Sequence, residues 1–156
     1  MLTQLSKLSL DADGRYASDS ELQFMENYLN STELRISAYE KIRDNEEQII
    51  EDWETERNNM KEPFFENGGE YVKSMSHRDI TIILRCSATA MLINDLDKLR
   101  DGMLIWVQTV FRACGMNECS TNIYRILQEI VPRYLSPEET QLILPTLQLN
   151  QTVFSF

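Results

Sequence analysis

The sequence predicts an all-α domain, and three observations support that fold class. Apolar residues recur at spacings of three and four along most of the 156-residue chain, as they do on the buried face of an amphipathic helix. No segment alternates apolar and polar residues long enough to indicate a half-buried strand. The composition, 42% hydrophobic and 26% charged with only five glycines, is typical of an ordinary globular domain with one packed core.

Residues 17–30 are predicted to form a short first helix. Ser18 followed three residues later by Glu21 is a capping-box pattern, in which each residue satisfies a backbone N–H group of the first turn. The apolar face of this helix consists of Leu22, Met25 and Leu29.

A longer second helix is predicted to start at Ser31 or Thr32 and to run to Met60. Its buried face is predicted to contain Tyr39, Ile42, Ile49, Ile50 and Trp53, and its solvent face carries Glu40, Asp44, Glu47, Glu51 and Glu54. Pro63 and the Asn67-Gly68-Gly69 cluster should then break the chain.

Residues 71–94 are predicted to form a third helix that ends at Asn94-Asp95. Arg78 and Arg85, seven residues apart, share one stripe of it. Its buried face is predicted to contain Met75, Ile82, Cys86, Thr89, Ala90 and Ile93.

Three further helices complete the predicted domain. Residues 103–114 form an apolar helix, expected to be buried, that Gly115 stops. The next helix begins near Asn117 or Ser120, and Pro132 should kink or end it. Ser136-Pro137-Glu138-Glu139 combines an N-cap, a proline at the first helical position and acidic residues in the first turn, which is a strong start signal. Pro145 is expected to end this last helix, so that 146–156 form a tail.

Charge and cysteine content exclude several function classes. The net charge is −10, and residues 1–70 hold 17 acidic against 7 basic residues, whereas the rest of the chain is neutral. This charge argues against a nucleic-acid partner, which clustered lysine and arginine would bind. No apolar run is long enough to predict a membrane span or a secretory signal. The three cysteines and the single histidine show no metal-ligand spacing and no catalytic constellation.

Two segments carry a resemblance to a known family. The first is LDADGRYASDSELQFMENYLN, with Asp13, Arg15, Tyr16, Ser18, Glu21 and Leu22, and the second is Ser76-His77-Arg78-Asp79 followed by Leu84-Arg85. Together they resemble the phycobiliproteins, the globin-like light-harvesting subunits of phycobilisomes, over roughly residues 8–140. The resemblance implies a globin-like helical domain over 31–145 and an N-terminal helical extension over 1–30 that pairs subunits. Tyr16, Glu21 and Leu22 would then lie at a subunit contact, although packing of this helix on the long acidic helix is an alternative.

The second segment corresponds to the motif that builds the family's bilin pocket. A bilin carries two propionates and a row of pyrrole N–H groups, which favour arginine and carboxylate partners respectively. By the resemblance, Arg78 would hold a propionate, Asp79 would accept the pyrrole N–H bonds, and Arg85 would support the other side of the pigment.

The chain departs from the family at the residue that attaches the pigment. Ser76 occupies the position of the attachment cysteine, and a serine hydroxyl is too weak a nucleophile to form that bond. Ile82-Ile83 replace the aromatic pair that members often carry in the pocket wall, and the stretch after Glu139 does not match. Cys86 is ten residues beyond Ser76 and off its helix line, so it is predicted to be a core residue rather than a substitute.

Three functions remain open at this point. The first is a non-catalytic accessory protein without covalent chromophore, acting in bilin biosynthesis, bilin handling or phycobilisome upkeep, similar to the bilin-biosynthesis-associated globins. The second is a light-harvesting subunit that holds a bilin non-covalently. The third is an assembly module that binds no small molecule. Expected partners are a second globin-like subunit or another copy of the chain, and a bilin-biosynthesis enzyme. The expected location is the cytoplasm, with association to phycobilisomes at the thylakoid surface.

Overall fold

The computed structural model describes the backbone of residues 1–59, 69–113 and 117–154, with side chains except for 69–75 and 117–123. Every regular element in these ranges is helical, which confirms the all-α prediction. In chain order the elements are α1 (Leu2–Asp11), α2 (Asp19–Asp44), α3 (Glu46–Asn59), α5 (Gly69–Leu92), α6 (Leu96–Leu99), the π-helical turn η1 (Arg100–Leu104), α7 (Ile105–Ala113), α8 (Asn117–Ile130), the 3-10 turn η2 (Val131–Tyr134) and α9 (Pro137–Phe154).

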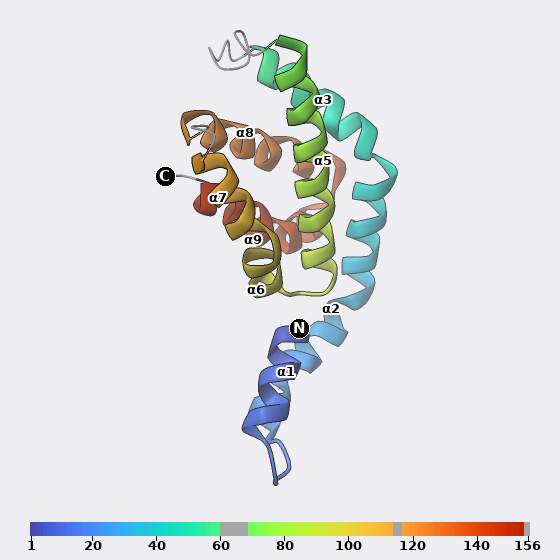
Figure 1. The fold of residues 1–156 in the computed structure, drawn as a ribbon. Coiled ribbons are helices and arrows are strands. Elements are labelled where there is room, and N and C mark those ends of the chain that lie inside the picture. Colours follow the sequence, from blue (N-terminus) through green and yellow to red (C-terminus); the bar gives the residue numbers. More distant parts are fainter. Residues whose placement is uncertain (60–68, 114–116, 155–156) are drawn as a thin grey trace.

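Helix α9 is the central element of the fold. It packs against α2, α5, α6, α7 and α8, while α3 packs against both α5 and α8. Figure 1 shows α2 and α3 wrapping one side of this bundle, and α1 and the first turns of α2 projecting together away from it. The core between these helices is built mainly from aliphatic side chains, with Trp53, Phe111, Tyr124 and Phe154 as its large aromatic residues.

Helix α2 is longer than predicted and passes through the expected boundary near residue 30. It begins at the predicted capping box, where the Ser18 backbone N–H donates to Glu21 Oε2 at 2.8 Å. The prediction of a second start at Ser31 or Thr32 is wrong. Their hydroxyls donate back to the carbonyls of Asn27 and Tyr28, at 3.0 and 2.9 Å, instead of capping a new helix.

The helix break lies at Asn45 instead. The Asn45 side-chain amide donates to the Lys41 carbonyl at 2.8 Å, and its backbone N–H donates to the same carbonyl at 3.1 Å. Asparagine competes for helix hydrogen bonds in this way and favours helix ends. The buried face beyond the break agrees with the prediction, because Ile49, Ile50 and Trp53 are all fully buried.

The prediction that Pro145 ends the last helix is also wrong. Helix α9 starts as predicted, with Ser136 and Glu139 each donating a backbone N–H to the other's side chain, but it continues through Pro145 to Phe154. Proline within a helix costs roughly 3 kcal/mol. Burial of the residues beyond it offsets that cost, since Thr146, Leu147, Asn150 and Phe154 are at most 1% exposed.

The predicted buried face of α5 is displaced. The residues that face the core are Ile80, Ile83, Leu84, Ser87, Ala88, Ala90 and Met91. Of the predicted face, Ala90 is buried as expected, Cys86 and Ile93 are half-buried, Ile82 is 44% exposed and Thr89 is exposed. The reason is that α5 packs against both α2 and α9, so its buried arc is wider than the single face that the sequence predicts.

Helix α7, which was predicted to be buried, is largely exposed. Trp106 is 68% exposed and Ile105 is 47% exposed, and Phe111 is its buried residue. The burial predicted from apolar content is therefore wrong for this helix, because α7 contacts the bundle through one side only.

Two further helix ends agree with the sequence. Asn94 adopts a positive φ of 49° between α5 and α6, and Pro132 lies at the start of η2, directly after α8 ends. The predictions for Met60, Pro63, Asn67, Gly68, Cys114 and Gly115 lie outside the described residues, as do the side chains of Met75 and Cys119. None of the described helices combines the length and the hydropathy needed to cross a bilayer.

Candidate functional site

The four residues of the pocket motif all lie on α5. Ser76 and Asp79 are half-buried, one helical turn apart, whereas the side chains of Arg78 and Arg85 are 68% and 64% exposed. Ser76 and Asp79 therefore lie on the same side of α5, Arg78 lies on the opposite side from Ser76, and Arg85 lies almost two turns further along.

Arg78 and Asp79 are paired with each other. Arg78 Nε and Nη2 both donate to Asp79 Oδ1 at 3.2 Å. Asp79 also acts on the neighbouring α8: burial raises the pKa of Tyr124 well above its ordinary value, and the negative charge of Asp79 raises it further. The carboxylate thus lies near an exposed cation and a buried phenol, and Arg78 uses one of its two oxygens, Oδ1.

Arg85 is turned away from the motif. Its Nε and Nη2 donate to the two carboxylate oxygens of Glu46 at 2.7 and 2.5 Å, and these bonds lower the pKa of Glu46. The bidentate pair bridges α5 to the start of α3 beside a polar groove of about 310 Å³ between α2 and α5. A planar, two-bond contact of this kind holds the guanidinium in one orientation. Arg85 is therefore engaged within the protein rather than presented to the Ser76 end of α5.

Cys86 is the described cysteine nearest to the motif, and its environment does not favour the thiolate. It is half-buried, and that burial raises the pKa of its thiol. Because the thiolate is the nucleophilic form, a raised pKa lowers its reactivity at neutral pH. The prediction of a core residue is correct only in part, since Cys86 packs against the core yet also lines a groove.

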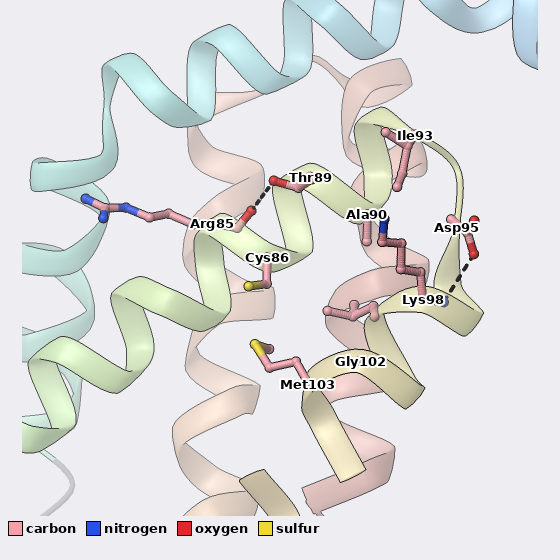
Figure 2. Close-up of a pocket in the computed structure, with 10 residues that line it drawn as sticks. Arg85, Cys86, Thr89, Ala90, Ile93, Asp95, Lys98, Gly102 and Met103 are labelled. Carbon is pink, nitrogen blue, oxygen red and sulfur yellow. Dashed lines mark hydrogen bonds between the residues drawn. The ribbon is translucent and has the colours of Figure 1, made fainter. Parts of the chain in front are cut away.

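That groove lies between the second half of α5 and the α6–η1 segment. Its volume is about 330 Å³. Figure 2 shows the sulfur atoms of Cys86 and Met103 facing each other across it, with Lys98 extending from α6 towards α5 and the Arg85 side chain directed away. The lining residues are Arg85, Cys86, Thr89, Ala90, Ile93, Asp95, Lys98, Leu99, Gly102 and Met103.

The residues expected at a subunit contact lie on the projecting part of the molecule. Tyr16 is 98% exposed and Leu22 is 39% exposed, while Glu21 accepts from Arg15 at 2.7 and 2.9 Å. Bonds from Arg15 and Ser18 lower the pKa of Glu21. Since Asp19–Asp44 is one continuous helix, Leu22 cannot fold back onto residues 31–44, as the intramolecular alternative required.

Several groups around the site were not identified from the sequence. Glu46 is 39 residues from Arg85 and has no local pattern that marks it as a partner. Gly102 carried a signal, because a glycine inside a helical stretch often has a packing or functional reason. No group of three or more potential metal-ligating residues occurs in the described part of the chain.

Comparisons with known proteins agree with this fold and motif. The all-α architecture agrees with the globin-like fold of the family that the two sequence segments resemble. A family model described as phycobilisome protein matches residues 8–151, and the chain therefore belongs to the phycobilisome protein family. It is similar to allophycocyanin subunit alpha-B of Picosynechococcus sp., with 25% identity over 151 residues, 92% of this chain and 94% of that protein.

Proposed function

We propose that this phycobilisome-type protein is a non-catalytic accessory protein that carries no covalent bilin and acts in bilin biosynthesis, bilin handling or phycobilisome upkeep. The observation that carries the proposal is the chemistry around Ser76. A hydroxyl stands where the family attaches its pigment, and the half-buried Cys86 has a raised thiol pKa. Neither group supplies the thiolate that the attachment needs.

The charged residues of the motif support the same proposal. Arg78 is paired with Asp79, and Arg85 is held by Glu46, so contacts of a bilin with these groups would share or replace pairings that the protein already makes. The Asp79 carboxylate, held beside the Arg78 guanidinium, is placed to accept hydrogen bonds from a ligand. Asp79 is therefore proposed as a binding residue, without a catalytic role.

A second candidate function is a light-harvesting subunit with a non-covalent bilin. The observation that favours it is the retention of Arg78 and Asp79 on the exposed end of α5. Contacts to a propionate and to pyrrole N–H groups would replace the mutual contact of Arg78 and Asp79 at 3.2 Å. This exchange would cost little free energy, because exposed ion pairs contribute only about 0–1 kcal/mol.

A third candidate, an assembly module without a small molecule, is favoured by the exposed apolar side chains of the projecting segment. Leu10, Tyr16 and Leu29 are 76%, 98% and 67% exposed. In each of the three functions this surface is proposed to pair with another globin-like subunit or a second copy of the chain, and in the first an enzyme of bilin biosynthesis is a further partner. We place the protein in the cytoplasm, at phycobilisomes on the thylakoid surface.

Co-production with a bilin pathway tests the attachment chemistry. We expect the wild-type chain to show no bilin fluorescence on a zinc-stained denaturing gel, because no thioether links pigment to protein. Ser76→Cys is expected to gain such a band if the remaining pocket accepts the pigment, and Ser74→Cys, two positions away on α5, is the matched control. Colour of the wild type in its native state alone would favour the second function. Pigment that remains on the denatured wild-type chain would contradict the proposal.

Analytical ultracentrifugation tests the pairing surface. We expect the wild-type chain, alone or mixed with a phycobilisome subunit, to sediment as a dimer at micromolar concentration. Leu22→Asp should weaken that dimer at least tenfold, since it places a charge on the surface that pairing buries. Ile82→Asp, an equivalent change at a side chain with 44% exposure on α5, should leave the dimer intact. A monomer at high concentration in every mixture would argue against the pairing role.

A further inference from the structure

We propose that the groove between α5 and the α6–η1 segment binds a small amphiphilic monocarboxylate. The apolar body of this ligand would lie between Cys86, Ala90 and Met103, and its carboxylate would contact the ammonium group of Lys98. The groove shares Arg85 with the bilin motif, but Ser76, Arg78 and Asp79 do not line it, and the inference rests on Lys98 rather than on Arg85.

The walls of the groove are suited to an apolar ligand body. Ala90 and Leu99 are 4% exposed, while Cys86, Ile93 and Met103 are half-buried, so most of the surface that faces the groove is carbon or sulfur. Methionine adapts its shape to a ligand more readily than branched side chains do. The volume of about 330 Å³ lies at the small end of the roughly 300–1,000 Å³ that ligand pockets occupy, which favours a short acyl chain over a large ring system.

The charges around the groove leave Lys98 for an anionic ligand. Arg85 is held by Glu46 at 2.7 Å. Asp95 is 3% exposed, and its carboxylate accepts from the Thr3 backbone at 2.7 Å, the Thr3 hydroxyl at 2.8 Å and the Lys98 backbone at 3.1 Å. Within the described residues, no hydrogen bond or ion pair is formed by the Lys98 ammonium. One available cation at the edge of an apolar groove fits a ligand with a single negative charge.

The backbone of η1 supports the assignment of a ligand site here. Residues 100–104 form a π-helical turn, a conformation that is rare and occurs frequently at functional sites. Gly102 lies within this turn, and a Cβ atom built on it would meet no other atom within 4 Å. A larger side chain at Gly102, which lines the groove, would therefore begin in open space.

Titration of the full chain with dodecanoate tests the proposal. Calorimetry should show saturable binding, and in protein labelled with ¹³C at its methionine methyl groups the Met103 signal, assigned with Met103→Leu, should shift. Dodecanol, which has the same chain without the charge, should bind at least fivefold more weakly. Saturable binding that shifts other methionine signals but leaves Met103 unchanged would overturn the assignment, as would the absence of saturable binding.

Two variants separate the charge from the cavity. Lys98→Gln should weaken dodecanoate binding at least fivefold and leave dodecanol binding unchanged, with Lys7→Gln as the control for an exposed lysine on another helix. Gly102→Leu should weaken both ligands at least tenfold by filling the groove, with Thr109→Leu on α7 as the control for added apolar surface. Because Lys98 is exposed, Lys98→Gln should fold even if Gly102→Leu does not. Unchanged dodecanoate affinity in Lys98→Gln would overturn the charge assignment.

Discussion

Replacement of Phe154 by alanine is expected to destabilise the protein by about 3–5 kcal/mol, the usual cost of removing a buried aromatic ring. Phe154 is fully buried. Its ring stacks on Tyr124 with centroids 4.3 Å apart and lies 5.5 Å from Phe111, so one side chain ties the end of α9 to α8 and α7. Urea unfolding followed by circular dichroism measures the effect as a lower transition midpoint with an unchanged slope.

Thr152→Ala is the matched control for Phe154→Ala, because Thr152 is exposed in the same helical turn. It should change the free energy of unfolding by less than about 0.5 kcal/mol. A loss of under about 1 kcal/mol for Phe154→Ala would show that residues 146–154 behave as a tail in solution and do not form part of the core.

Replacement of Glu139 by alanine is expected to cost about 3 kcal/mol at neutral pH. Glu139 is 2% exposed. Its carboxylate accepts from Lys41 at 2.7 and 2.8 Å, from the Ser37 hydroxyl at 2.7 Å and from the Ser136 backbone N–H at 2.7 Å. Removal of the carboxylate leaves these donors without their acceptor and loosens the contact between α2 and the start of α9.

The same residue predicts how stability depends on pH. Burial alone would raise the pKa of Glu139, but the bonds from Lys41, Ser136 and Ser37 outweigh it and lower the pKa to about 2. Because the folded-state pKa lies below the unfolded one, the stabilisation is complete above about pH 5 and is lost as the pH falls towards 2.

Unfolding at pH 7 and at pH 3 measures this effect. The difference in free energy of unfolding between wild type and Glu139→Ala should be smaller at pH 3 than at pH 7. Glu138→Ala, at the exposed neighbouring residue, should have a free energy of unfolding close to that of the wild type at both pH values. An equal difference between wild type and Glu139→Ala at pH 7 and pH 3 would contradict the proposed role of the carboxylate.

Local chemistry explains which parts of the fold were predictable. Ser18 with Glu21 and Ser136 with Glu139 mark helix starts because each pair satisfies backbone N–H groups within four residues. Pro132 marks a helix end for an equally local reason. Ser31 misled the prediction, because a hydroxyl within a helix can bond to an earlier carbonyl and leave the helix intact.

In the candidate site, too, local features were predictable and long-range contacts were not. The resemblance located Ser76, Arg78, Asp79 and Arg85 on one helix, and α5 places them there. Whether these side chains are available to a ligand depends on residues that are distant along the chain. Glu46 engages Arg85 across 39 residues, and the groove is completed by α6 and η1, whose side chains have no pattern that relates them to α5.

By itself, the sequence determined the all-α class, the starts of α2, α8 and α9, the acidity of the N-terminal half and the serine at the attachment position, because composition and short-range hydrogen bonding encode them. Only the tertiary structure decided which faces are buried. It carried α9 through Pro145, exposed α7 and turned Arg85 towards Glu46. These outcomes depend on the summed burial and pairing of groups that are distant along the chain, and such sums outweigh local preferences of about 1–3 kcal/mol.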